Sequence, residues 1–218
     1  MFVKICGIRS QETAMMAVRA GADAIGFVFA RSRRQVAPEK AEEIAAAVGS
    51  KVKKVGVFVN ADPLEIGHIA ARCGLDFVQL HGTEAPEVCN LLRRVLADYG
   101  LRVRLIKAVR VRDRSALRRA RSYPADVILF DTYVSGSQGG TGRAFDWDHV
   151  VDHGLEVPVI LAGGLNPRNV GAAVQRVRPW GVDVSSGVET NGEKDPDKMA
   201  RFVQEVRRWQ EWLSDSRS

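Results

Sequence analysis

Two ionisable residues, Cys6 and Asp131, each end an apolar run and are the residues of this chain best placed for chemistry. Cys6 is followed directly by Gly7, and Asp131 follows the four apolar residues 127–130. Parallel α/β folds gather their reactive groups at the carboxyl ends of strands, where a thiol and a carboxyl group would form a proton-transfer couple. Each residue also has a simpler interpretation: a lone cysteine can be a small buried hydrophobe, and an aspartate can cap a turn.

Two glycine-containing segments, Gly163-Gly164 and Ser185-Ser186-Gly187, follow the last two apolar runs. Glycines let backbone N–H groups approach a phosphate closely, and the loops after strands seven and eight of a barrel are a common phosphate site. A helix N-terminus near Ser186 and Gly187 would add the positive end of its dipole. Each segment alone could be a tight turn, but together they predict phosphate binding. Neither matches a Walker or dinucleotide motif, which disfavours nucleotide hydrolysis and NAD chemistry.

The elements that would position these residues alternate along the chain. Apolar, β-branched runs occur at Phe2–Cys6, Ala24–Phe29, Val52–Val59, Phe77–Leu80, Val103–Val109, Val127–Phe130, Val157–Leu161 and Val182–Val184. Most are nearly continuous, as expected for parallel strands buried on both faces. Eight such runs separated by helical segments predict an α/β fold, a (β/α)8 TIM barrel with eight parallel strands. A doubly wound sheet shares this repeat and is the alternative.

Several helical segments carry start signals. Ser10 can cap the first helix, and Asp62, Asn166 and Asp195 each precede a proline at the expected first helical position. Residues 112–125 predict only a short or irregular fifth helix, because Arg, Ser, Tyr and Pro interrupt the pattern. We find no linker or change of composition, so residues 1–218 are expected to form a single domain.

Composition indicates an ordinary globular protein, with 45% hydrophobic and 27% charged residues among 218. Three irregularly spaced cysteines argue against a disulfide framework and for a reducing compartment. No Cys/His cluster suggests a metal, and no segment approaches the roughly 20 apolar residues that span a bilayer. We therefore expect a cytoplasmic protein without metal or membrane association.

The formal charge of +6 comes largely from arginine, which is dense between Arg102 and Arg121. Such a cluster could contact nucleic acid, but we favour a solvated outer helix with its flanking loops as the explanation. Tyr123 is the one aromatic residue nearby, so no stacking surface for single strands is evident. We expect no nucleic-acid partner, and the positive charge also suits a small anionic substrate.

A glycine-rich stretch, residues 135–143, follows the sixth run and is too long for a simple connector. Its functional interpretation is a mobile lid containing Gly139, Gly140, Gly142 and Arg143. Its simpler interpretation is a flexible loop.

Seven short motifs, in order along nearly the whole chain, together resemble the phosphoribosylanthranilate isomerases of tryptophan biosynthesis. They are Lys-Ile-Cys-Gly-Ile at 4–8, Gly-Ala-Asp-Ala-Ile-Gly-Phe-Val-Phe at 21–29, Val-Gln-Leu-His-Gly at 78–82, Phe-Asp-Thr at 130–132, Gly-Gly-Thr-Gly with Phe-Asp-Trp at 139–147, Gly-Gly-Leu-Asn-Pro at 163–167 and Asp-Val-Ser-Ser-Gly-Val-Glu at 183–189.

The resemblance implies an Amadori rearrangement of N-(5-phosphoribosyl)anthranilate to 1-(2-carboxyphenylamino)-1-deoxyribulose 5-phosphate, without a cofactor. By similarity Asp131 is the general acid that protonates the ring oxygen, and Cys6 is the general base that removes the C2′ proton. A thiol, with a usual pKa near 8.5, must be lowered toward neutrality to act as a base. Lys4 or a nearby helix end could contribute to this. Monomer and homodimer remain open.

The family's anthranilate-binding arginine lies in a motif of the form Ser-x-Arg-x-Ile/Val-x-Pro, which residues 32–38 fit with Arg34 in that role. A guanidinium fork suits a planar carboxylate. The segment before Ser32 is one residue shorter than the family pattern, so Arg31 or Arg33 could take the role instead.

By the same similarity, Gln79, His81 and Asp183 line the substrate pocket. Arg143 stands where a lysine is frequent in the lid, which keeps the charge. Three alternatives remain: a related barrel acting on a histidine-pathway aminoaldose, a nucleic-acid-binding protein and a catalytically silent barrel. The arginine motif and Cys6 argue against the first, and intact Cys6 and Asp131 argue against the last.

Overall fold

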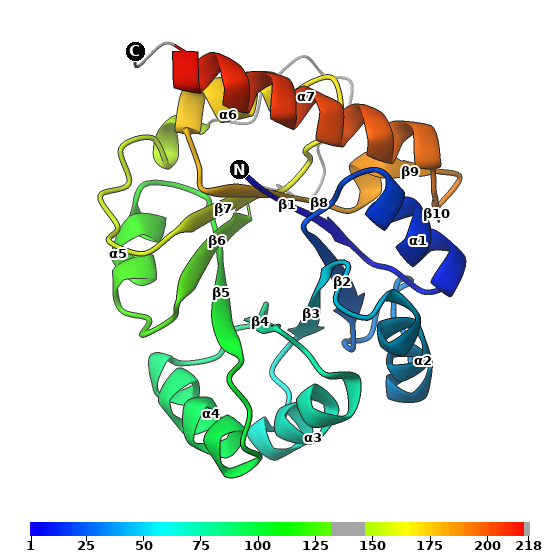
Figure 1. The fold of residues 1–218 in the computed structure, drawn as a ribbon. Helices are drawn as coiled ribbons and strands as arrows, with labels where there is room; N and C mark the ends of the chain where they lie inside the picture. Colours follow the sequence, from blue (N-terminus) through cyan, green and yellow to red (C-terminus); the bar gives the residue numbers. More distant parts are fainter. Residues whose placement is uncertain (132–146, 216–218) are drawn as a thin grey trace.

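A closed barrel of eight parallel strands forms the centre of the molecule (Figure 1). The computed structural model describes residues 1–131 and 147–215. The strands are β1 (Phe2–Cys6), β2 (Ala24–Val28), β3 (Lys53–Phe58), β4 (Phe77–Leu80), β5 (Arg104–Arg110), β6 (Val127–Asp131), β7 (Val159–Ala162) and β8 (Gly181–Val184). Because β1 pairs with β8 as well as with β2, the sheet closes on itself. The predicted TIM barrel is confirmed, and an open doubly wound sheet is excluded.

Helices surround the barrel as an outer ring (Figure 1). They are α1 (Gln11–Arg19), α2 (Pro38–Val48), α3 (Pro63–Cys73), α4 (Pro86–Asp98), α5 (Ser115–Arg121), α6 (Val170–Val177) and α7 (Pro196–Asp215). Short 3-10 turns, η1 (Trp147–His149) and η2 (Ser186–Val188), and a hairpin of β9 (Glu189–Thr190) and β10 (Glu193–Lys194) complete the described elements. None of the helices in the described ranges is long and apolar enough to cross a membrane.

Three of the four predicted capping residues lie directly before a helix, and the fourth lies before a turn. The side chains of Ser10, Asp62 and Asp195 each accept a hydrogen bond from a backbone N–H of the following turn, at 3.1, 2.7 and 3.0 Å. Asn166 also accepts such a bond, at 2.9 Å, but the residues after it form a turn and α6 begins only at Val170. The predicted start of this helix was therefore too early.

The predicted short fifth helix is confirmed as the seven residues of α5. Three arginines of the arginine-rich segment donate hydrogen bonds to nearby backbone carbonyls: Arg119 to Arg110, Arg121 to His153 and Arg114 to Asp148. These side chains therefore tie α5 and its flanking loops to neighbouring segments.

Two layers of buried apolar side chains pack against the strands of the barrel. One fills the space between strands and helices, and the other fills the barrel interior with Ala24, Val55, Phe77, Ile106, Ala108, Val127, Leu129, Ile160 and Ala162. Side chains alternate between these layers along each strand. The alternation places Lys4 and Cys6 of β1, Gln79 of β4 and Asp183 of β8 inside the barrel, where all four are buried. Polar groups in an apolar interior must be paired, so these residues mark the site.

Candidate active site

Cys6 and Asp131 both lie at the carboxyl edge of the barrel, as predicted. Each is the last residue of its strand, β1 and β6 respectively, so β6 extends one residue further than the apolar run indicated. The Cys6 residue is 8% exposed and the Asp131 side chain 17%. Both groups therefore border the mouth of the barrel, where a ligand can reach them.

Burial sets the ionisation of Cys6. Desolvation raises the pKa of the thiol, and Asp183 adds to this, whereas the ammonium groups of Lys4 and Lys194 lower it. The net effect is a pKa above the usual value for cysteine. Lys4 thus lowers the pKa of Cys6, as expected, but the effect of burial is larger.

Lys4 forms a buried ion pair beneath Cys6. The two residues Lys4 and Asp183 are paired in register across β1 and β8, and Lys4 Nζ lies 3.1 Å from Asp183 Oδ1. Burial alone would lower the pKa of Lys4, but Asp183 and Cys6 outweigh this and raise it. Lys4 is therefore a cation inside the barrel. Asp183, predicted to line the substrate pocket, is the counter-ion of this cation.

A hydrogen-bonded chain runs from Gln79 through His81 to Asp131. Gln79 Nε2 lies 2.7 Å from His81 Nδ1, and His81 Nε2 lies 3.2 Å from Asp131 Oδ2. With the Gln79 amide in this orientation, its NH2 donates to Nδ1 and the ring proton is on Nε2, which donates to Asp131. The opposite amide orientation would give the other tautomer. The structure thus brings three of the predicted site residues together.

A second buried ion pair holds the loop that carries His81. Lys107 Nζ donates to Glu84 Oε2 at 2.6 Å and to the carbonyl of Gly82 at 2.9 Å, and both charged side chains are almost fully buried. Glu84 Oε1 accepts from the backbone N–H of Asn60 at 2.8 Å. The pair anchors residues 81–84 to β5. Sequence reasoning missed this pair, because Lys107 lies within an apolar run and its partner is on another loop.

Arg34 is the arginine that the structure places beside Cys6. A Cβ atom added to Gly7 would lie 2.5 Å from Arg34 Cδ and 3.3 Å from Ser185 Oγ, so the three residues pack together. Arg33 is largely exposed by comparison. The geometry favours Arg34 over its neighbours as the arginine at the pocket.

Glu189 holds Arg34 in place. It accepts from Arg34 Nε at 2.7 Å and Nη2 at 2.8 Å, from Lys194 Nζ at 2.8 Å and from Arg33 Nη2 at 2.9 Å. Burial would raise the pKa of this carboxyl, but these cations outweigh it and hold the pKa at about 2. Sequence reasoning did not single out Glu189 or Lys194.

The two predicted phosphate loops approach each other closely. A Cβ at Gly187 would lie 1.8 Å from the carbonyl oxygen of Leu165, so only glycine lets the loop after β8 pack against the loop after β7. Gly163 and Gly164 have φ angles of 90° and 66°. Ser186 begins the 3-10 turn η2, and its three residues replace the helix N-terminus that we expected here.

The predicted lid residues Gly139, Gly140, Gly142 and Arg143 lie outside the described residues. Among the residues that the structure does describe, no group of three His, Cys, Asp or Glu side chains could hold a metal ion.

The fold and site together define a (β/α)8-barrel enzyme with a thiol and a carboxyl group at the ends of two strands and glycine loops after the last two. The model of the N-(5′-phosphoribosyl)anthranilate isomerase family matches residues 3–205. The chain belongs to this family, as the motifs predicted.

Individual relatives agree. The N-(5′-phosphoribosyl)anthranilate isomerase of Desulforudis audaxviator is 50% identical over 207 residues, which are 94% of this chain and 97% of the relative. A crystal structure of the Thermotoga maritima phosphoribosyl anthranilate isomerase is 42% identical, has a TM-score of 0.81 and is matched over 95% of this chain and 98% of that one. A further structure of such an isomerase, 39% identical with a TM-score of 0.79 and the same coverage, contains reduced 1-(o-carboxyphenylamino)-1-deoxyribulose 5-phosphate.

Proposed function

We propose that Cys6 and Asp131 are the base and acid of the reaction that defines this family. The reaction converts N-(5′-phosphoribosyl)anthranilate to 1-(2-carboxyphenylamino)-1-deoxyribulose 5-phosphate in tryptophan biosynthesis. It moves protons within one molecule and needs an acid and a base on different sides of the bound sugar. The position of the two groups at the ends of different strands, β1 and β6, is the observation that carries the assignment.

The chemistry divides between the two groups. Asp131 donates a proton to the furanose ring oxygen as the C1′–O bond breaks, and the anthranilate nitrogen supplies the electron pair that forms the C=N bond. The thiolate of Cys6 then removes the C2′ proton, and the electrons of that C–H bond return through C=N to nitrogen. The resulting enolamine tautomerises to the ketone. His81 orients the Asp131 carboxyl group for the first step.

The remaining contacts divide between the two ends of the substrate. Gly163, Gly164, Ser185, Ser186 and Gly187 are proposed to bind the phosphate through backbone N–H groups, with the glycines admitting its oxygen atoms.

Arg34 is proposed to bind the anthranilate carboxylate. Glu189 engages Nε and Nη2 of this guanidinium, and the described residues give Nη1 no hydrogen-bond partner. A substrate carboxylate can therefore approach Arg34 through Nη1 while Glu189 keeps the fork in place.

The arginine-rich segment does not require a nucleic-acid partner. Arg114, Arg119 and Arg121 donate hydrogen bonds to backbone carbonyls of neighbouring segments, which gives these three side chains a structural role. The small phosphorylated substrate of the family is thus the partner that the site fits best.

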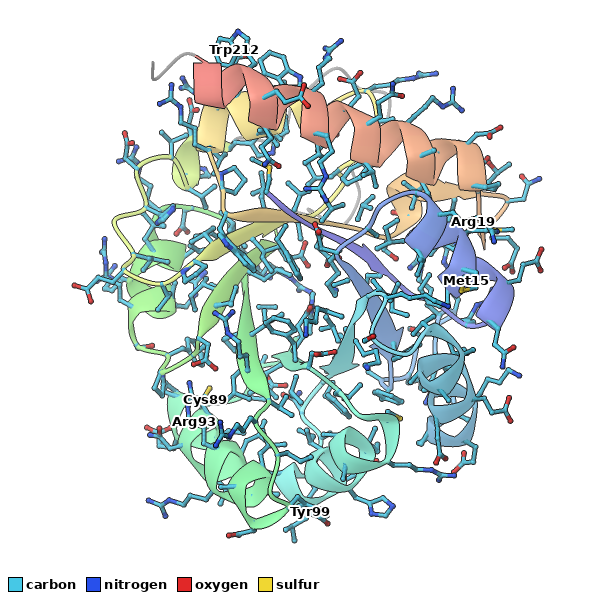
Figure 2. All side chains as sticks on the ribbon, viewed as in Figure 1. Met15, Arg19, Cys89, Arg93, Tyr99 and Trp212 are labelled. Carbon is cyan, nitrogen blue, oxygen red and sulfur yellow. The ribbon has the colours of Figure 1, made fainter. Side chains whose placement is uncertain are left out.

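Substitution of the two proposed groups tests the assignment. With phosphoribosylanthranilate generated in situ and its fluorescence followed, Cys6→Ala and Asp131→Asn should each abolish turnover. Binding of a reduced product analogue should remain largely intact. Cys89→Ala is the matched control, because Cys89 lies on α4 in the outer ring (Figure 2). Wild-type turnover in Cys6→Ala or Asp131→Asn would refute the corresponding role.

A further inference from the structure

A base that removes a proton from carbon must be a thiolate, yet Cys6 lies where a negative charge is poorly solvated. Its burial raises the pKa of the thiol in the free protein. Either the thiolate is rare, or a group inside the barrel stabilises it when it forms. A cation in contact with the sulfur is the ordinary solution to this problem.

Lys4 is such a cation. Lys4 and Cys6 lie two residues apart on β1, so their side chains point to the same face of the strand, into the barrel. The ammonium group of Lys4 lowers the pKa of the Cys6 thiol through its charge, and Lys4 is 0% exposed. Because this ammonium group is shielded from bulk solvent, its attraction to a thiolate is only weakly screened.

Gly26 of β2 allows this contact. It is paired in register with Cys6, and a Cβ atom at this position would lie 2.8 Å from Cys6 Sγ and 3.1 Å from Lys4 Cε. Both side chains therefore lie against the same bare backbone position. Any side chain on Gly26 would separate the lysine stem from the sulfur or displace both.

Asp183 holds the ammonium group in position. It approaches Lys4 Nζ at 3.1 Å from the neighbouring strand and, as a carboxylate, keeps the buried lysine charged. A buried ammonium without such a partner would lose its proton more readily. Asp183 thus works on Cys6 in two ways: it maintains the cation, and it repels the thiolate directly.

Two further cations face Cys6, Lys194 of β10 and Arg34 of the loop after β2. Both are hydrogen-bonded to Glu189, and Lys194 also donates to the carbonyl of Ser185 at 3.0 Å. Their charge is thus shared with a carboxylate. Lys4 lies on the same strand as Cys6, and of these cations it lowers the pKa of the thiol most.

We propose that Lys4 is a positioning residue that acts through Cys6: its buried ammonium group lies on the same strand face as the sulfur and stabilises the thiolate by its charge, while Asp183 holds Lys4 in place. This inference rests on the proposed role of Cys6 as the base. It adds the group that keeps a buried cysteine ionised to the extent that this role requires.

Alkylation of Cys6 by iodoacetamide tests the proposal in the free enzyme, without turnover. The background is Cys73→Ser/Cys89→Ser, in which Cys6 is the remaining cysteine. The pH midpoint of the alkylation rate reports the thiol pKa. In Lys4→Met the midpoint should rise by at least about one unit, so that alkylation at a fixed pH below it slows roughly tenfold. The ascending limb of the kcat/KM profile should move in the same direction, and Lys4→Arg should restore part of the shift.

A second pair of variants covers the case in which Lys4→Met fails to fold because Asp183 is left buried without its partner. Asp183→Asn and Lys4→Met/Asp183→Asn differ only at Lys4, and the double variant contains no unpaired charge of this pair. Its alkylation midpoint should be the higher of the two. Equal midpoints in whichever pair folds would overturn the role of Lys4. Turnover by Cys6→Ala would instead overturn the base assignment, and the alkylation results would still stand.

Discussion

His81 Nε2 lies 3.2 Å from Asp131 Oδ2, so a residue that follows β4 holds the carboxyl group at the end of β6. The imidazole is itself held at Nδ1 by Gln79, whose side chain is buried inside the barrel. An aspartate at a strand end can rotate freely, and a general acid works only when its proton faces the acceptor atom. The orientation of the proposed acid therefore depends on Gln79 of β4 and on His81 directly after this strand.

Removing His81 should consequently impair chemistry more than binding. We expect His81→Ala to lower kcat by roughly 10- to 100-fold, less than Asp131→Asn, because the acid remains but loses its orientation. KM should change far less. Steady-state kinetics measures both, with His68→Ala on the exposed face of α3 as the control. An unchanged kcat in His81→Ala would show that Asp131 needs no such support.

The barrel could be predicted because its signals are local. Continuous β-branched runs indicate strands buried on both faces, and proline after a capping residue indicates a helix start. Strand order then places the ends of β1 and β6 at one edge, which was enough to bring Cys6 and Asp131 to the same site. The start of α6 was predicted too early for a local reason as well: Asn166 caps a turn before α6 and not the helix itself.

The charge partners could not be predicted in the same way. Arg34 and Glu189 are 155 residues apart, and they meet only because the barrel closes and brings the loops after β2 and β8 together. Lys107 sits in an apolar run, where nothing in the pattern shows that Glu84 folds back over it. The ionisation of Cys6 depends on burial, which an isolated motif does not reveal.

Arg34 should dominate recognition of the anthranilate carboxylate. We expect Arg34→Lys to raise KM roughly tenfold or more, because an ammonium group cannot bond Glu189 with two nitrogens and still present a third to the substrate. Arg31→Lys and Arg33→Lys, on more exposed side chains, should change KM little. Affinity for a product analogue provides an independent measure. Equal effects at all three positions would mean that another residue binds the carboxylate.

Gly26 should be required for activity more than for folding. In Gly26→Ala the new methyl group would meet Cys6 Sγ and the Cys6 backbone at 2.8 and 3.1 Å. We expect kcat to fall by roughly 100-fold or more as the sulfur is displaced, with a cost of about 1–3 kcal/mol in unfolding free energy from overpacking. Gly49→Ala is the control: φ at Gly49 is 55° and nothing lies within 4 Å, so only stability should suffer.

Lys107 should prove important for stability. Lys107→Met leaves the carboxylate of Glu84 buried without its cation, which typically costs about 3–5 kcal/mol. The double variant Lys107→Met/Glu84→Gln removes both charges and should recover part of this loss. Urea denaturation of the three proteins measures the effect. A double variant no more stable than Lys107→Met would show that the backbone contacts of Glu84, and not the ion pair, hold the loop.

Glu189 should make the protein sensitive to acid. Its pKa in the folded protein is about 2, below the ordinary value of 4.5, so the unfolded chain binds a proton at higher pH than the folded one. The stabilisation is fully present above the unfolded value and is lost as the pH falls from about 5 to about 2. At about 1.4 kcal/mol per pH unit, the difference between these two pKa values amounts to roughly 3–4 kcal/mol.

Glu189→Gln removes this titration. We expect the variant to be less stable than the wild type at pH 7, with the difference shrinking steadily as the pH falls toward 2, because protonation of the wild-type carboxylate abolishes the same ion pairs. Urea denaturation at several pH values measures the difference, and Glu65→Gln, at an exposed position on α3, is the control. A constant difference across this range would show that Arg33, Arg34 and Lys194 do not depend on the charge of Glu189.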